Sequence, residues 1–275
     1  MSEWGVYPSL MDWPGAVVNQ QEISRSVQDL RLVADFSDYS VLPDLSSLRA
    51  LWCFGIDEKK WAEISSCFGL RRLFIEGLKV RDLSRVHNLT DLRVFSLEDC
   101  SFITELDEIG KLYRLKGLSI SNFKNVHSLK PLANMVELQH LAVTGGMWAR
   151  MKVDSLDPLS NLTKLEWMDL GNTKVTDDSL RALGHLTELE YLNLPNFFPM
   201  KEFAWLSGRL SGTLCTWFEP YIDLPFMVCK KCSASEMVML AGKGKANLCK
   251  CCDETRLRKH IDEFDRIASQ SKLAE

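Results

Sequence analysis

The chain has 275 residues, of which 46% are hydrophobic and 25% are charged, so it contains ample apolar material for a core. Its formal net charge of −4 disfavours a nucleic-acid binder that uses its whole surface. No stretch approaches the roughly 18 consecutive apolar residues of a membrane span, so we expect no membrane partner. The first residues lack a positive segment followed by an apolar run, so we also expect no secretory leader.

An apolar triplet with the spacing L-x-x-L-x-L recurs along most of the chain, with starts at positions 27, 48, 70, 92, 115, 138, 165 and 189. Successive starts are 21 to 27 residues apart. The last two members of each triplet are separated by one residue, which is the alternation of a strand with two inward side chains. Amphipathic helices are the alternative, but so many matches to a two-residue step favour one short strand per repeat.

These triplets resemble leucine-rich repeats of the bacterial and intracellular type, and the passage from Leu92 to Ile120 resembles repeats of intracellular immune receptors. The resemblance implies an α/β solenoid with a parallel sheet on its concave face. It does not imply a particular function. The chain departs from the family at the third position after each triplet, where only Cys100 matches the usual Asn or Cys, so we expect no regular asparagine ladder. In the long sixth repeat, residues 145–148 (Gly-Gly-Met-Trp) predict a loop.

Three segments follow from this pattern. We expect an N-terminal cap over residues 1–26 and a solenoid of about eight repeats over residues 27–207. Residues 208–275 should form a C-terminal cap and a zinc-binding module with a terminal helix.

Residues between the inward-pointing positions of each strand should line the concave face. Aromatic side chains are costly to leave in water there and are enriched at binding hot spots, whereas acidic side chains favour a basic or mixed-charge partner. We therefore predict a partner-binding face made of Trp52, Phe54, Phe74, Glu76, Glu98, His140, Trp167, Asp169 and Tyr191. Alternatively, the N-terminal segment or the C-terminal module of the same chain covers these aromatic side chains.

The nine cysteines divide into four scattered ones and five between positions 229 and 252. Such clustering without a secretory leader indicates metal binding in a reducing compartment, and hence a cytoplasmic location. Cys229 and Cys232 form one C-x-x-C pair, and Cys249 and Cys252 form a second pair after sixteen intervening residues. This spacing is typical of zinc sites, and Cys251 is an alternative ligand to Cys252.

Met237–Leu240 predicts a hairpin strand between the two cysteine pairs, and Asp253 and Glu254 open a helix. We expect His260 on the surface of that helix. The order knuckle, hairpin, knuckle, helix resembles treble-clef or zinc-ribbon modules. Four thiolates leave no open coordination position, so the predicted Zn²⁺ is structural.

The sequence between Gly242 and Lys245 does not complete a phosphate-binding loop, because Met239 and Ala246 stand at required positions. No serine-hydrolase, kinase or zinc-protease motif is present in the sequence, so we expect no enzyme. The sequence favours a monomeric recognition or adaptor protein that binds another protein on its concave face. One alternative is a nucleic-acid-associated zinc-ribbon protein, suggested by the lysines around the cysteines; another is a neutralising protein of the immunity or antitoxin type.

Overall fold

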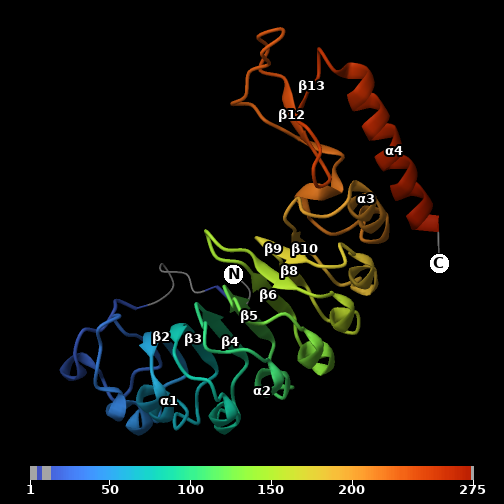
Figure 1. Cartoon of the computed structure of the whole chain (residues 1–275). Coiled ribbons are helices and arrows are strands. Elements are labelled where there is room, and N and C mark those ends of the chain that lie inside the picture. Colours follow the sequence, from blue (N-terminus) through green and yellow to red (C-terminus); the bar gives the residue numbers. More distant parts are fainter. Residues whose placement is uncertain (1–4, 8–13, 274–275) are drawn as a thin grey trace.

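A computed structural model of the chain describes residues 5–7 and 14–273. In this described part, eight parallel strands form the main sheet, in the order β1-β2-β3-β4-β5-β6-β8-β10. Figure 1 shows that the strands line the inner side of a curved array and that the short helices lie on its outer side. The predicted repeat solenoid, with one strand at each of the eight triplets, is thus confirmed.

Each strand pairs with the next at equivalent repeat positions. Trp52 lies opposite Phe74, and Glu76 lies opposite Glu98, so each predicted column of side chains runs across the sheet. The triplet leucines, such as Leu73, alternate with these residues and are fully buried. The strands are β1 (Asp29–Arg31), β2 (Ala50–Ile56), β3 (Arg72–Leu78), β4 (Val94–Glu98), β5 (Gly117–Ser121), β6 (His140–Thr144), β8 (Trp167–Asp169) and β10 (Tyr191–Asn193).

Short helical segments return the chain from one strand to the next. They are η2 (Tyr39–Asp44), α1 (Glu58–Ile64), η3 (Ser84–Asn88), α2 (Asp107–Gly110), η4 (Lys130–Asn134), η5 (Asp157–Leu159) and η6 (Arg181–His185). Their apolar side chains, such as Val86 and Leu132, are fully buried and belong to one continuous core with the strand leucines. No repeat can bury its apolar face alone, so the stability of the array is cooperative.

The turn out of the sheet contains a ladder of residues with positive φ, one position before the place where the family pattern has Asn or Cys. Its residues stand two positions after the triplet, not three, and their φ angles lie between 52° and 77°. They are Gly55, Gly77, Asp99, Asn122 and Asn172. Glycine, asparagine and aspartate tolerate this left-handed conformation best, which explains the residue types. The Asn172 amide also donates a 2.7 Å hydrogen bond to the carbonyl of Gly146 in the preceding repeat.

The sixth repeat carries the predicted loop, which leads into a second, two-stranded parallel sheet of β7 (Met151–Val153) and β9 (Thr173–Val175). A β-carbon at Gly145 would lie 2.3 Å from the carbonyl oxygen of Asn172, so this close approach requires glycine. The loop projects Trp148 into solvent.

Both ends of the sheet are extended by single bridges that the triplets did not predict. Val17, which belongs to the predicted cap, pairs with Leu32 directly after β1. This cap, residues 1–26, includes η1 (Gln20–Glu22) but lies partly outside the described residues. At the other end, Leu214 pairs with Tyr191 and adds a further rung.

The C-terminal region begins with α3 (Met200–Arg209) and η7 (Thr216–Phe218). It continues with an antiparallel sheet of β11 (Tyr221–Asp223), β12 (Met237–Leu240) and β13 (Leu248–Cys249), and ends with α4 (Glu254–Leu273). The predicted hairpin strand and terminal helix are confirmed. The surface position expected for His260 is wrong: its side chain is buried, and Nε2 lies 2.9 Å from the carbonyl oxygen of Pro220.

The C-terminal module is attached to the last repeat by close contacts. Helix α4 lies against α3, where the Ser271 hydroxyl donates a 2.8 Å hydrogen bond to the carbonyl of Trp205. The Asn196 amide donates to the carbonyl of Leu240 at 2.9 Å and accepts from the backbone amide of Gly242 at 2.7 Å. The module therefore covers the end of the solenoid core. None of the helices in the described ranges is long and apolar enough to cross a bilayer.

Candidate functional site

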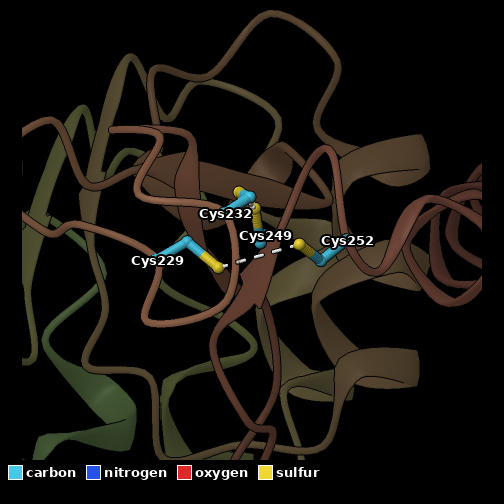
Figure 2. Close-up of side chains that lie close together, drawn as sticks. All are labelled: Cys229, Cys232, Cys249 and Cys252. Atoms are coloured by element: carbon cyan, nitrogen blue, oxygen red, sulfur yellow. Dashed lines mark hydrogen bonds between the residues drawn. The ribbon is translucent and has the colours of Figure 1, made fainter.

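Four cysteine sulfurs converge at the far end of the C-terminal module (Figure 2). Their Sγ atoms all lie within 4.8 Å of one another. Cys229 Sγ is 3.9 Å from Cys252 Sγ, and Cys232 Sγ is 3.7 Å from Cys249 Sγ. A tetrahedral zinc site with metal–sulfur bonds of about 2.3 Å places its sulfurs about 3.8 Å apart. The four thiols therefore fit a tetrahedral metal ion.

The geometry decides between the two adjacent cysteines that the sequence left open. Cys252 belongs to the cluster, whereas the neighbouring Cys251 is exposed and lies outside it. The backbone amide of Cys249 donates a 3.1 Å hydrogen bond to the carboxylate of Asp253, which fixes the second knuckle at the start of α4. The chain therefore presents the first and last cysteine of this knuckle, as in the first knuckle.

The local electrostatics act in opposite directions on two of the four thiols. The backbone amides of Cys232 and Lys231 lower the pKa of Cys229 to about 6, because their hydrogen bonds stabilise the negative sulfur. Crowding has the opposite effect on Cys252: its hydrogen bond to Cys232, followed by burial, raises the pKa of its thiol to about 12. A divalent cation at the centre would take the place of the retained proton.

The module has a small core of its own. Apart from the main core, the described structure contains a cluster of buried apolar residues here, namely Val238, Leu240, Leu248 and Leu257. Such a small core contributes limited stability, so a bound metal ion would supply part of the folding free energy. Four thiolate ligands would leave no position for a reacting water.

Three of the lysines around the cysteines have acidic partners. Lys250 forms an ion pair of 2.6 Å with Asp223, and Lys243 pairs with Asp178 of the solenoid. Lys231 lies 4.0 Å from the carboxylate of Asp253. This pairing reduces the positive field that a nucleic-acid backbone requires.

Three aromatic side chains stack across the concave face at its C-terminal end. The ring of Trp167 on β8 lies between His140 on β6 and Tyr191 on β10, at centroid distances of 5.9 Å and 5.6 Å. The planes are tilted by only 17° and 10°. The three residues occupy the same repeat position, so the strand register itself produces the stack.

Residues from the N-terminal segment lie on this stack. The Tyr7 ring meets Trp167 edge-on at 5.5 Å, and its hydroxyl donates a 2.8 Å hydrogen bond to Asp169 Oδ2. Val6 is buried. The alternative noted from the sequence, in which the N-terminal segment covers concave aromatic residues, therefore holds for part of the face.

Two predicted solvent-facing residues are buried, which corrects their assignment as accessible anchors. Phe74 is 3% exposed and His140 is 8% exposed. Phe74 lies opposite Trp52 in the sheet and lines a small hollow together with Trp52 and Tyr7, and His140 is covered on one side by Trp167. Of the remaining predicted residues, the half-buried ones are Trp52, Phe54, Trp167 and Asp169, and the exposed ones are Glu76, Glu98 and Tyr191.

Two of the predicted acidic residues are neighbours on adjacent strands, since Glu76 pairs with Glu98 in the sheet register. Partial desolvation of its carboxyl group raises the pKa of Glu98, although the residue as a whole is exposed, and the charges of Glu76 and Asp99 raise it further. This part of the concave face is therefore negative.

Sequence reasoning did not assign to the binding face two exposed residues of the loop after β6, Met147 and Trp148, which are 84% and 93% exposed. Met147 borders a shallow hollow together with Tyr7 and Asp169. The sequence did contain a signal for their exposure. Two large apolar residues follow two glycines in a predicted loop, at positions that do not point into the core of the repeat.

Comparisons with known proteins agree with the repeat fold. A family model for a leucine-rich repeat region matches residues 47–212. An internalin (inlF) from Listeria monocytogenes is 23% identical, with a TM-score of 0.50 over 70% of this chain and 61% of its own. Internalin C2 from the same organism is 21% identical, with a TM-score of 0.44 over 55% of this chain and 64% of its own.

A leucine-rich-repeat protein of Leptospira interrogans is 20% identical, with a TM-score of 0.48 over 62% of this chain and 43% of its own. The chain thus spans less than two thirds of the length of these three proteins. No functionally curated protein matches the sequence.

Proposed function

This chain belongs to the leucine-rich-repeat family, and we propose that it is a recognition module that binds another protein on the concave face of its sheet. The observation that carries the proposal is the exposure of Trp148, which is 93% exposed in the loop after β6, next to Met147, which borders a hollow with Tyr7 and Asp169. A large apolar side chain in this position commonly marks a protein contact, and tryptophan is enriched among binding hot spots. Members of this family serve mainly in recognition, so we assign the chain a binding role without catalysis.

The C-terminal end of the face is the best-supported contact surface. We call it the aromatic end and define it by Met147, Trp148, Trp167 and Tyr191. Trp148 and Tyr191 are exposed, whereas Trp167 is held between rigid neighbours. Rigid aromatic anchors lose little conformational freedom on binding, which favours affinity. At the opposite end of the sheet, the Arg31 guanidinium lies over the Trp52 ring at 4.6 Å and covers it.

We further propose that Cys229, Cys232, Cys249 and Cys252 hold one structural Zn²⁺. The sulfur spacing and the all-thiolate donor set support this ion over harder cations such as Mg²⁺, which prefer oxygen ligands. Its role would be to keep the hairpin and α4 together at the end of the solenoid. Thiolate ligands and the free cysteines of the core fit a reducing compartment, so we propose a cytoplasmic location.

Site-specific photo-crosslinking tests the proposed surface in lysate from the source cell. One variant carries p-benzoylphenylalanine at position 148, and the control carries it at position 113, where an exposed tyrosine lies on the loop before β5. We expect a defined protein adduct from position 148 and a much weaker one from position 113. Equal adducts from both positions would reject the aromatic end as the binding surface.

A further inference from the structure

The aromatic end contains a pocket of about 350 Å³ between the N-terminal residues and the sheet. The rings of His140, Trp167 and Tyr191 line it from the strands, and Gly5, Val6 and Tyr7 line it from the N-terminal segment. Two carboxylate residues, Glu166 and Glu190, complete the lining directly before β8 and β10. The pocket therefore combines an aromatic wall with two acidic groups.

Neither acidic group of the pocket forms an ion pair with a cation of the described residues. Glu166 accepts a 3.1 Å hydrogen bond from the neutral amide of Gln139, and the charge of Glu190 acts on the buried ring of His140 in the same pocket. The adjacent Glu137 differs, because Lys116 and Lys164 bind it at 2.6 Å and 2.5 Å. Within the described residues, lysines thus neutralise Glu137, whereas Glu166 and Glu190 have no lysine or arginine partner.

A third carboxylate beside the pocket also has neutral partners. Asp169 accepts hydrogen bonds from the Tyr7 hydroxyl, from the Asn193 amide at 2.8 Å and from the backbone amide of Gly171 at 2.7 Å. Negative charge is therefore concentrated around an apolar hollow. An acidic ligand group would be repelled there, and a purely apolar group would bury part of the carboxylates without a partner.

We propose that this pocket binds a long cationic side chain, preferably arginine, from a basic segment of the partner protein. This inference rests on the proposed function of the concave face. The apolar stem of arginine would lie against the rings, as long charged side chains do on apolar surfaces. Its planar guanidinium offers five N–H donors in a fixed fork that suits carboxylates, whereas a compact ammonium offers three.

Nuclear magnetic resonance with a minimal probe tests this assignment on the full chain. The probe is N-acetyl-arginine-N-methylamide, and its control is the citrulline analogue, which has the same shape without the charge. The signal is the indole N–H of Trp167, identified through Trp167→Phe. We expect a saturable shift with the arginine probe and binding about fivefold weaker for the citrulline analogue, which corresponds to a partly exposed ion pair.

Three variants connect the signal with the pocket. Glu166→Gln and Glu190→Gln should each weaken binding of the arginine probe by about fivefold. Glu105→Gln, which removes an exposed carboxylate before α2, should leave it unchanged. Unchanged melting temperatures of the variants would show that their folds are intact.

Absence of a saturable shift, equal affinity for arginine and citrulline, or insensitivity to both glutamate substitutions would each overturn the pocket assignment. The proposed function fails separately. If crosslinking from position 148 still captures a partner while arginine shows no preference, the concave face binds protein and only the cationic pocket is wrong.

Discussion

The hydroxyl of Tyr7 donates a 2.8 Å hydrogen bond to the carboxylate of Asp169, 162 residues further along the chain. This contact fixes N-terminal residues on β8, in the middle of the surface that we propose for the partner. Tyr7 also lines the pocket that contains Glu166 and Glu190. The N-terminal segment is therefore part of the concave face, and a partner must bind beside Tyr7 or displace it.

Removing the Tyr7 hydroxyl tests this contact. Tyr7→Phe should lower the free energy of unfolding by about 0.5 to 1 kcal/mol, because a half-exposed hydrogen bond to a carboxylate contributes in the lower part of the usual range. Tyr113→Phe is the control, since Tyr113 is exposed and lies away from the concave face. Urea unfolding of both variants measures the difference. The same loss in both variants would show that Tyr7 is not held on β8.

Metal content distinguishes the two neighbouring cysteines. Purified protein should contain about one zinc ion per chain, and Cys252→Ser should lose most of it, because a closed thiolate site needs all four ligands. Cys251→Ser should retain zinc, since its sulfur lies outside the cluster. Elemental analysis with titration of free thiols measures both. Zinc loss from Cys251→Ser with retention in Cys252→Ser would reverse the assignment.

Acid should destabilise the stacked histidine. Burial lowers the pKa of His140 below its ordinary value of 6.5, and Glu190 only partly opposes the shift. The unfolded chain therefore binds this proton more readily, so the contribution to stability is complete above about pH 6.5 and is lost as the pH falls below it. Unfolding at about pH 7.5 and about pH 5.5 should show a smaller pH dependence for His140→Gln than for the wild type.

His185 provides the control for that experiment, because its side chain is exposed. His185→Gln should keep the pH dependence of the wild type. An unchanged pH dependence in His140→Gln would show that protonation of His140 is not coupled to folding. His260, whose pKa burial also lowers, should account for part of the dependence that remains.

The close packing of α4 against α3 depends on the absence of a side chain at Gly208. A β-carbon at Gly208 would lie 2.1 Å from the carbonyl oxygen of Ala268, so Gly208→Ala must move α4 away from α3. We expect a loss of about 1 to 3 kcal/mol, which outweighs the gain of up to about 1 kcal/mol in helix propensity. Gly212→Ala is the matched control, because nothing lies within 4 Å of its added carbon. Hydrogen exchange should be faster in α4 for Gly208→Ala alone; equal exchange would contradict the packing.

The repeat architecture is predictable because its signal is local and periodic. Strand alternation around pairs such as Leu73 and Ile75 determines which side chains point inward, and the constant period then determines the register. The columns that run through Trp52 and Trp167 follow directly. The C-x-x-C spacing likewise predicts the sulfur cluster, since each knuckle is built within one turn.

Contacts between distant segments leave no such signal. Nothing near Tyr7 in the sequence indicates that it lies on β8. The choice of Cys252 over Cys251 depends on how the second knuckle turns into α4. The positive-φ residues of the turns were not predicted, because they stand one position before the one that the family pattern marks.

The central claim is that the aromatic end binds the partner, and paired measurements of capture and stability on Trp148→Ala test it most directly. The partner identified by crosslinking should bind the immobilised variant more weakly, with a loss of binding free energy of about 2 kcal/mol or more, as for a hot-spot tryptophan. The free energy of unfolding should change by less than about 0.5 kcal/mol, because Trp148 is 93% exposed. Trp167→Ala should lose both binding and stability, since its ring lies between two others. Undiminished capture by Trp148→Ala and Trp167→Ala, with lower stability only in the latter, would contradict the claim and leave these rings a purely structural role.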